Sequence, residues 1–128
     1  MFLRNTMDLL DHDIDILAHP TRIFRRSERP IPTRLYEPIV RRAAERGVSI
    51  ELNSHSQKDP DADFARLCIQ HGIRVAMSTD THNIAELGDF THQRGILDEI
   101  GIGDGDLDKH IFTLDDLRDN PRHRRLGR

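Results

Sequence analysis

The sequence predicts an α/β fold in which parallel strands alternate with helices. Three short apolar segments are typical of buried strands, at about residues 13–18, 48–53 and 73–79. Between and after them, apolar residues recur at helical spacing, and each run stops at a glycine, the residue that commonly ends a helix. The order strand–helix–strand–helix–strand–helix implies parallel strands joined by right-handed crossovers.

The remaining elements follow in order along the chain. Helices are expected within residues 1–12, from Leu35 to Ala44, around Phe64–Cys68 and near 90–100, with Gly47, Gly72 and Gly101 after the last three. We assign residues 1–105 to the α/β portion. Residues 106–128 would add a short strand at Ile111–Phe112, a helix capped by Thr113, and a basic tail from Pro121 that is either solvated or an arm for anionic ligands.

Each predicted strand has one apolar face and one small or polar face. The apolar faces are Ile14, Ile16 and Ala18; Val48, Ile50 and Leu52; and Val75 and Met77. The other faces are Asp15, Leu17 and His19; Ser49, Glu51 and Asn53; and Ala76, Ser78 and Asp80. A strand between two helix layers is apolar on both faces, whereas a barrel strand can be polar inward. The pattern favours part of a TIM-like barrel, although an open sheet with one polar face also fits.

Composition narrows the classes of function. The chain has 128 residues, enough for one domain, and its formal net charge of −3 gives no support to general nucleic-acid binding. Cys68 is the single cysteine, so no internal disulfide can form, which suits a reducing compartment. There is no apolar run near the ~20 residues that a membrane span needs. We expect a cytoplasmic protein without a membrane partner.

Two predicted strand ends carry side chains that bind metals. Asp80 and His82 follow the third strand, and residues two apart in an extended segment point the same way. His19 follows the first strand and precedes Pro20. In parallel α/β folds, functional groups gather at the carboxyl ends of strands. Carboxylate and imidazole are good ligands for zinc, manganese or iron, so a divalent metal ion is the expected cofactor.

Three segments in register resemble the C-terminal part of the PHP domain, the polymerase and histidinol phosphatase family. They are residues 15–20, 49–54 and 72–82, and the resemblance covers roughly residues 8–101. It implies the C-terminal portion of a distorted (β/α)7 barrel, with two or three metal ions at its mouth. It also implies hydrolysis of a phosphorylated small molecule or nucleotide by a metal-bound water. Nucleic acid would be a partner only within a larger, polymerase-type protein.

The resemblance assigns metal-binding roles residue by residue. His19 takes the place of a metal-binding histidine, and Asp80 and His82 take the places of the last two ligands. Glu51 matches a segment that lines the mouth, where it would be either a metal ligand or one half of a structural ion pair, because an unpaired buried carboxylate is costly.

Substrate-binding candidates surround these ligands. Arg22 and Arg25 lie in the basic loop after His19, where they would either be solvated or hold a phosphate through a bidentate fork. Asn53 lines the same mouth. His55 follows the second strand near the mouth, where it is either an exposed loop histidine or a functional residue that binds metal, acts as an acid or binds substrate. The resemblance identifies no catalytic acid or base.

The chain also departs from the family pattern. PHP domains begin with a His-x-His ligand pair, and this sequence contains none. We expect either a fragment of a longer gene product or a split or degenerate member. As an enzyme it would be incomplete, binding one metal ion weakly; the alternative is a non-catalytic metal-binding or assembly module. Unpaired strand edges would favour a homo-oligomer or pairing with a missing N-terminal half.

Overall fold

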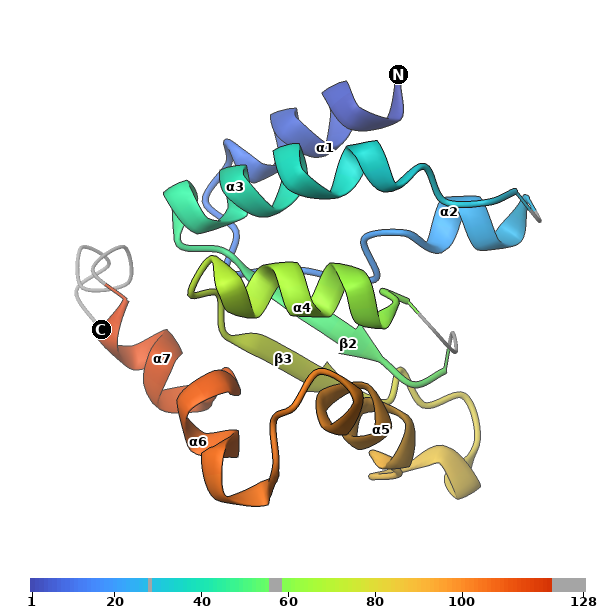
Figure 1. Ribbon diagram of the computed structural model, residues 1–128, viewed down its shortest axis with the longest axis vertical. Coiled ribbons are helices and arrows are strands. Elements are labelled where there is room, and N and C mark those ends of the chain that lie inside the picture. The colour runs from blue at the N-terminus through green and yellow to red at the C-terminus, as the bar shows by residue number, and fades with distance from the viewer. Residues whose placement is uncertain (28, 56–58, 121–128) are drawn as a thin grey trace.

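Three short parallel strands form the centre of the fold in the computed structural model, which describes residues 1–27, 29–55 and 59–120 (Figure 1). The strands are β1 (Ile16–Leu17), β2 (Ser49–Asn53) and β3 (Val75–Ser78), and they lie in the order β1-β2-β3. Both pairs are parallel, as the sequence predicts. The α/β class is therefore confirmed. Within the described ranges the sheet has these three strands, and the barrel stays a prediction.

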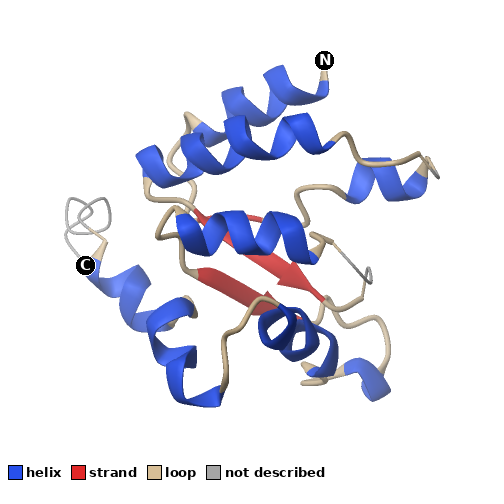
Figure 2. Ribbon diagram, viewed as in Figure 1, coloured by secondary structure: helices blue, strands red, loops and turns tan. Residues whose placement is uncertain are grey.

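Helices connect and cover the strands. They are α1 (Phe2–Leu10), α2 (Arg22–Arg26), α3 (Tyr36–Arg46), α4 (Ala62–Gln70), α5 (Thr91–Glu99), α6 (Leu107–His110) and α7 (Leu114–Asp119), with 3-10 turns η1 (Thr33–Leu35), η2 (Ile84–Glu86) and η3 (Asp104–Asp106). In Figures 1 and 2, α3 and α4 lie side by side over one face of the sheet. Helix α1 packs against α3, and α5 packs against α4. None of these described helices has the length and apolar character that crossing a membrane requires.

Local sequence explains where the covering helices end. Gly47 closes α3 in the left-handed region at φ 63°, and its amide donates to carbonyls of the last turn. Only glycine enters that region without a steric cost from a Cβ atom. Asp61 begins α4 by accepting a hydrogen bond from the Phe64 amide. The chain can therefore reverse sharply into β2 and enter α4 at a defined residue.

The core forms between the sheet and these helices. Ile50 and Leu52 from β2 and Phe64 from α4 are fully buried. The rings of Phe64 and Tyr36 form a T-shaped pair with centroids 4.9 Å apart. Burying an aromatic or large aliphatic side chain of this kind contributes about 1.5–3 kcal/mol. This apolar contact fixes α3 and α4 against the strands that carry the candidate site.

The prediction that Ile16 lies on the apolar face of β1 is wrong. Ile16 lies beside Ser49, and Leu17 lies beside Ile50. Adjacent residues of parallel strands point to the same face, so Leu17, and not Ile16, is on the apolar face. Leu17 is accordingly buried at 4% exposure. The strand is two residues long, and a shift of one residue exchanges its faces.

The central strand is covered on both faces. Ser49, Glu51 and Asn53 are buried together with the two apolar residues between them. The polar face of β2 is therefore not an open surface. Its buried groups need partners, which are described with the site below.

A terminal segment lies beside β3. Ile111 forms a single parallel bridge with Val75, and the Phe112 amide donates to the Val75 carbonyl at 2.8 Å. Thr113 and Asp116 form a reciprocal capping box that starts α7. The basic tail from Pro121 lies outside the described residues.

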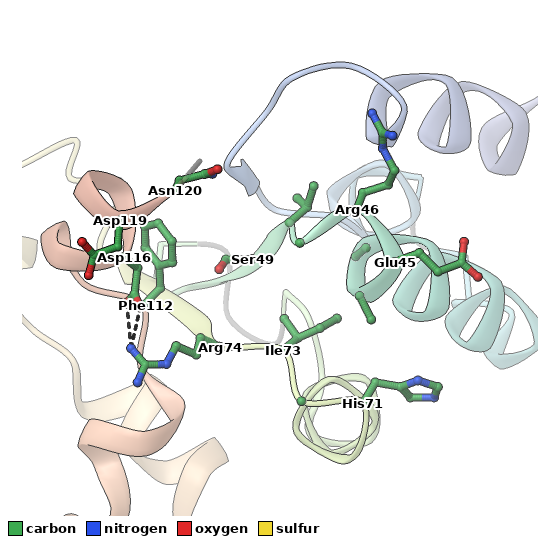
Figure 3. Close-up of a pocket in the computed structure, with 15 residues that line it drawn as sticks. Glu45, Arg46, Ser49, His71, Ile73, Arg74, Phe112, Asp116, Asp119 and Asn120 are labelled. Atoms are coloured by element: carbon green, nitrogen blue, oxygen red, sulfur yellow. Dashed lines mark hydrogen bonds and ion pairs between the residues drawn. The ribbon is translucent and has the colours of Figure 1, made fainter. Parts of the chain in front are cut away.

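Polar contacts hold α7 against the amino ends of the strands. Arg74 donates to both oxygens of Asp116, at 2.6 and 2.9 Å (Figure 3). Asn120 donates to the Asp15 carboxylate at 2.9 Å. A cavity of about 670 Å³ separates α7 from the end of α3, and Ser49 is on its wall. This cavity lies at the opposite end of the strands from His19, Asp80 and His82.

The thiol of Cys68 should be unreactive in the native protein. Its side chain is fully buried, and burial raises its pKa because the thiolate is poorly solvated there. We expect Ellman's reagent to label no thiol in the folded chain and one in urea. Rapid labelling without denaturant would show that α4 opens readily.

The Arg74–Asp116 contact should stabilise the protein in a pH-dependent way. Burial works to raise the pKa of Asp116, but hydrogen bonds from the Thr113 amide and from Arg74 outweigh it and keep this pKa below its ordinary value. A lowered folded-state pKa gives stability that is present above the unfolded value of about 3.9 and is lost as the pH falls through the folded value.

Urea titrations across pH provide the measurement. The stability advantage of the wild type over Asp116→Asn should be constant above about pH 5 and should shrink in more acidic buffer. When Arg74→Gln is introduced into both proteins, the stability difference between them should become smaller, because one of the two donors to Asp116 is removed. Parallel pH curves for wild type and Asp116→Asn would contradict the assignment.

Candidate metal site

The register of β2 and β3 brings two loops together at the carboxyl ends of the strands. Asn53 lies beside Ser78, the last residue of β3. One residue further on, the Ser54 amide donates to the Ser78 carbonyl at 3.0 Å. The segments that continue to His55 and to His82 therefore leave the sheet side by side.

Glu51 finds its partner in the loop after β1. The residue is 8% exposed, and its Oε2 accepts a hydrogen bond of 2.6 Å from the His19 backbone amide. This contact ties the exit of β1 to the centre of the sheet.

Asp80 is paired with Arg22. A guanidinium nitrogen of Arg22 lies 2.5 Å from the Asp80 carboxylate, and both side chains are largely shielded from solvent. Arg22 is the main reason why the pKa of Asp80 lies below its ordinary value, against the opposing effect of burial. An expected phosphate-binding residue and an expected metal ligand thus neutralise each other. The side chain of Arg25 lies outside the described part of the chain.

Two of the predicted ligands adopt an uncommon backbone conformation. His19 has φ 31° and Asp80 has φ 45°, and they are the two non-glycine residues with positive φ in the described ranges. Asp and His enter this region more readily than most residues, but the conformation still costs energy. Such residues cluster at functional sites, where a side chain must be aimed in a particular direction.

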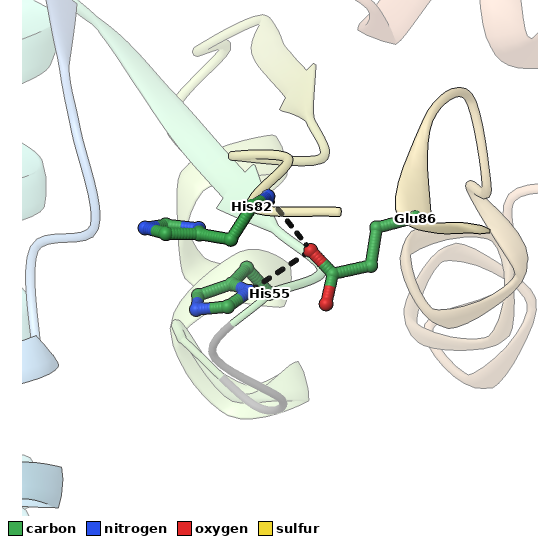
Figure 4. A group of neighbouring side chains, drawn as sticks. All are labelled: His55, His82 and Glu86. Atoms are coloured by element: carbon green, nitrogen blue, oxygen red, sulfur yellow. Dashed lines mark hydrogen bonds and ion pairs between the residues drawn. The ribbon is translucent and has the colours of Figure 1, made fainter. Parts of the chain in front are cut away.

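His82 is brought together with His55 and Glu86 (Figure 4). One ligand atom from each of these three residues lies within 4.8 Å of the others. The two imidazole rings are stacked, with centroids 4.0 Å apart. Nδ1 of His55 lies 3.2 Å from Oε2 of Glu86. Two imidazoles and a carboxylate are a donor set that could bind a divalent metal ion.

Glu86 is held in place from several sides. Its Oε2 accepts a hydrogen bond from the His82 amide at 3.0 Å, and its Oε1 accepts one from Asn83 at 2.7 Å. The His82 amide is the main reason why the pKa of Glu86 lies below its ordinary value, and His55 adds to the effect against the opposing effect of burial. The carboxylate is therefore both oriented and anionic at neutral pH.

The expected trio of His19, Asp80 and His82 is not one cluster. Within the described residues, the group of three close metal-type ligands is His55, His82 and Glu86. His82 belongs to that group, while Asp80 pairs with Arg22. The roles proposed for His19, Asp80 and Glu51 as ligands stay predictions.

Four residues at this end of the sheet were missed by the sequence reasoning: Glu86, Thr21, Asp59 and Gln93. Asp59 is 1% exposed, and its Oδ1 accepts hydrogen bonds from the amide and hydroxyl of Thr21, at 2.9 and 2.5 Å. Glu86 had one local signal, since Asn83 followed by Glu86 is typical of a capped helical turn. Gln93 and Asp59 had none, because nothing in a local pattern tells a buried polar residue from an exposed one.

Gln93 fastens α5 to the two strands that carry the site. It is fully buried, and its Nε2 donates to the Ser78 carbonyl at 2.8 Å and to the Leu52 carbonyl at 3.3 Å. These carbonyls lie at the ends of neighbouring strands. Gln93 therefore holds the ends of β2 and β3 at the spacing that brings their loops together.

Comparisons with known proteins point to phosphatases. The chain is 32% identical over 93 residues to a probable phosphatase from Acetivibrio thermocellus; the match covers 68% of this chain and 36% of that protein. It is 30% identical over 94 residues to a probable phosphatase from Clostridium novyi, with the same two coverages. The chain thus spans about a third of the length of these curated relatives. No family model matches it, and no solved structure matches it significantly.

These findings define an α/β protein with candidate metal ligands at the carboxyl ends of its strands. Its similarity is to proteins named as phosphatases, which supports a phosphatase-type family. They do not single out the PHP family, which stays a prediction from the sequence motifs.

Replacing Gln93 by Ala should destabilise the protein by about 2–3 kcal/mol, because a buried side chain and two hydrogen bonds are lost together. Urea unfolding should show a lower midpoint with an unchanged m-value. Gln70→Ala, at an exposed position on α4, is the matched control and should stay within about 0.5 kcal/mol of the wild type. Equal unfolding midpoints for the two variants would show that the hydrogen bonds of Gln93 do not stabilise the ends of β2 and β3.

Proposed function

We propose that the chain is the metal-binding part of a PHP-type phosphoesterase, which hydrolyses a phosphorylated small molecule or nucleotide. The observation that carries this proposal is the group of close metal-type side chains, His55, His82 and Glu86, at the carboxyl ends of parallel strands. The similarity to two proteins named as probable phosphatases supports it. A bound divalent ion would polarise the phosphoryl group and lower the pKa of a water ligand to about 7.

His19, Asp80 and His82 are the proposed metal ligands, with Glu51 as a further candidate. The left-handed backbone at His19 and Asp80 supports a functional role, since strain of this kind is retained where a side chain must be placed. Glu51 would act mainly by holding the His19 amide. Its ligand role would require that hydrogen bond to loosen.

Arg22 is the proposed phosphate-binding residue. Its guanidinium is held against Asp80 by charge. A cation on Asp80 would repel the guanidinium and release it toward an anionic phosphate, for which Arg offers two parallel donors. Asn53, which lies beside Ser78 at the same end of the strands, would help to position the substrate. Metal binding and phosphate binding would then be linked through one ion pair.

A second candidate function is a metal-binding or assembly module without catalysis. The observation that favours it is that the described residues bring together one group of three close metal-type ligands, while Asp80 is paired with Arg22. Such a chain would bind an ion and still lack the cluster that phosphate hydrolysis needs.

Hydrolysis of p-nitrophenyl phosphate by the purified chain tests the proposal. We expect slow turnover that requires added Zn²⁺ or Mn²⁺ and is abolished by EDTA. Asp80→Asn and His19→Asn should each lower it by at least ~10–100-fold. Asparagine is the suitable replacement, because it tolerates the left-handed backbone at both positions.

Arg22→Gln separates the roles of the ion pair. Loss of the phosphate-binding residue should raise KM for the substrate, whereas metal binding should become tighter once Asp80 is free. His71→Ala, at the opposite end of the strands, is the control and should match the wild type. Metal binding without any turnover would favour the second candidate, and metal-independent turnover would overturn both.

A further inference from the structure

We propose that His55, His82 and Glu86 form a zinc-type site for a single ion, and that this is the first metal site to fill. The inference goes beyond the proposed function, because it assigns two ligands, His55 and Glu86, that the motif resemblance does not supply. It concerns binding and stands whether or not the chain hydrolyses phosphate esters.

The separation of the donor atoms fits one shared ion. Nδ1 of His55 and Oε2 of Glu86 are 3.2 Å apart. Two ligands at 2.0–2.2 Å from zinc with a tetrahedral angle between them lie about 3.4 Å from each other. Almost no movement is therefore needed to replace the hydrogen bond between these atoms by two bonds to an ion.

The third ligand comes from the ring stacked on His55. His82 offers a ring nitrogen within 4.8 Å of the other two donor atoms, and Figure 4 shows both imidazoles on the same side of Glu86. The His82 amide also donates to Glu86, so the residue that supplies one ligand orients another. Groups that orient ligands in this way raise metal affinity by limiting the reorganisation on binding.

Two other carboxylates near the site that could bind a metal ion are already paired. Asp80 is held by Arg22, and Glu51 accepts a short hydrogen bond from the His19 amide. An ion that used either carboxylate would first have to break that contact. At the group of His55, His82 and Glu86, the contact between His55 and Glu86 would be replaced by two metal bonds. Nδ1 of His82 lies 2.6 Å from the Asp80 carbonyl oxygen, so Nε2 is the ring nitrogen that an ion would use without breaking that contact.

The exposure of the cluster suits a site with an open position. The side chains of His55 and Glu86 are 34% and 32% exposed, and His82 is exposed as well. An ion can enter from solvent, and a fourth ligand can come from water or from an oxygen of a ligand. Two histidines and one glutamate with a free fourth position are a known catalytic zinc arrangement.

Isothermal titration of the whole chain with Zn²⁺ tests this assignment. We expect one ion per chain in the wild type and at least ~10-fold weaker binding in His55→Ala and in Glu86→Gln. The matched controls are His71→Ala and Glu37→Gln, a second surface pair in which His71 Nε2 lies 3.3 Å from Glu37 Oε1. These controls should bind zinc as the wild type does.

A second pair of variants separates this site from the one in the proposed function. His19→Asn and Asp80→Asn should retain the first ion even if they abolish phosphatase turnover. Cobalt(II) added in place of zinc should give the strong visible absorption of a tetrahedral site in these two variants, and a weak one in His55→Ala. Circular dichroism checks that each variant is folded.

Two results would overturn the inference. One is unchanged zinc affinity in both His55→Ala and Glu86→Gln. The other is loss of the first ion in His19→Asn or Asp80→Asn with the cluster intact, which would place that ion on the motif residues. Loss of turnover with zinc binding unchanged would contradict the proposed hydrolysis and would support a site that binds the ion independently of catalysis.

Discussion

The candidate site depends on the register between β2 and β3. Asn53 lies beside Ser78, and Gln93 from α5 bridges the carbonyl groups at this end of the two strands. Parallel strands end at the same edge of a sheet, so the loops that follow them emerge together. His55 and Glu86 are 31 residues apart in the sequence, yet this register places them in contact. A shift of β2 by one residue would point its polar side chains toward the apolar core.

Hydrogen bonding to carboxylates is the second organising feature. Each buried or half-buried carboxylate at this end of the strands has a donor: the His19 amide for Glu51, Arg22 for Asp80, and Thr21 for Asp59. An incoming cation therefore competes with protein donors, so its affinity depends on how easily each contact is given up.

The sequence predicted those features that depend on local patterns. The place of each strand along the chain, the glycine that ends α3 and the N-cap of α7 all follow from residues within a few positions of one another. The face of β1 was predicted wrongly, because a two-residue strand carries too little alternation to define its register. That register is set by pairing with Ser49 and Ile50 instead.

The motif residues and the group of His55, His82 and Glu86 show the same difference between local sequence information and tertiary contacts. The sequence by itself determined that His19, Asp80 and His82 follow strand ends, because chain order places them there. Only the tertiary structure decided that His82 meets His55 and Glu86, and that Asp80 meets Arg22. Loop conformation depends on hydrogen bonds between distant segments, such as that from the His82 amide to Glu86 and those made by Gln93. Hydrophobic periodicity carries no information about such contacts, since it reports burial along one element and not the partner that lies across the site.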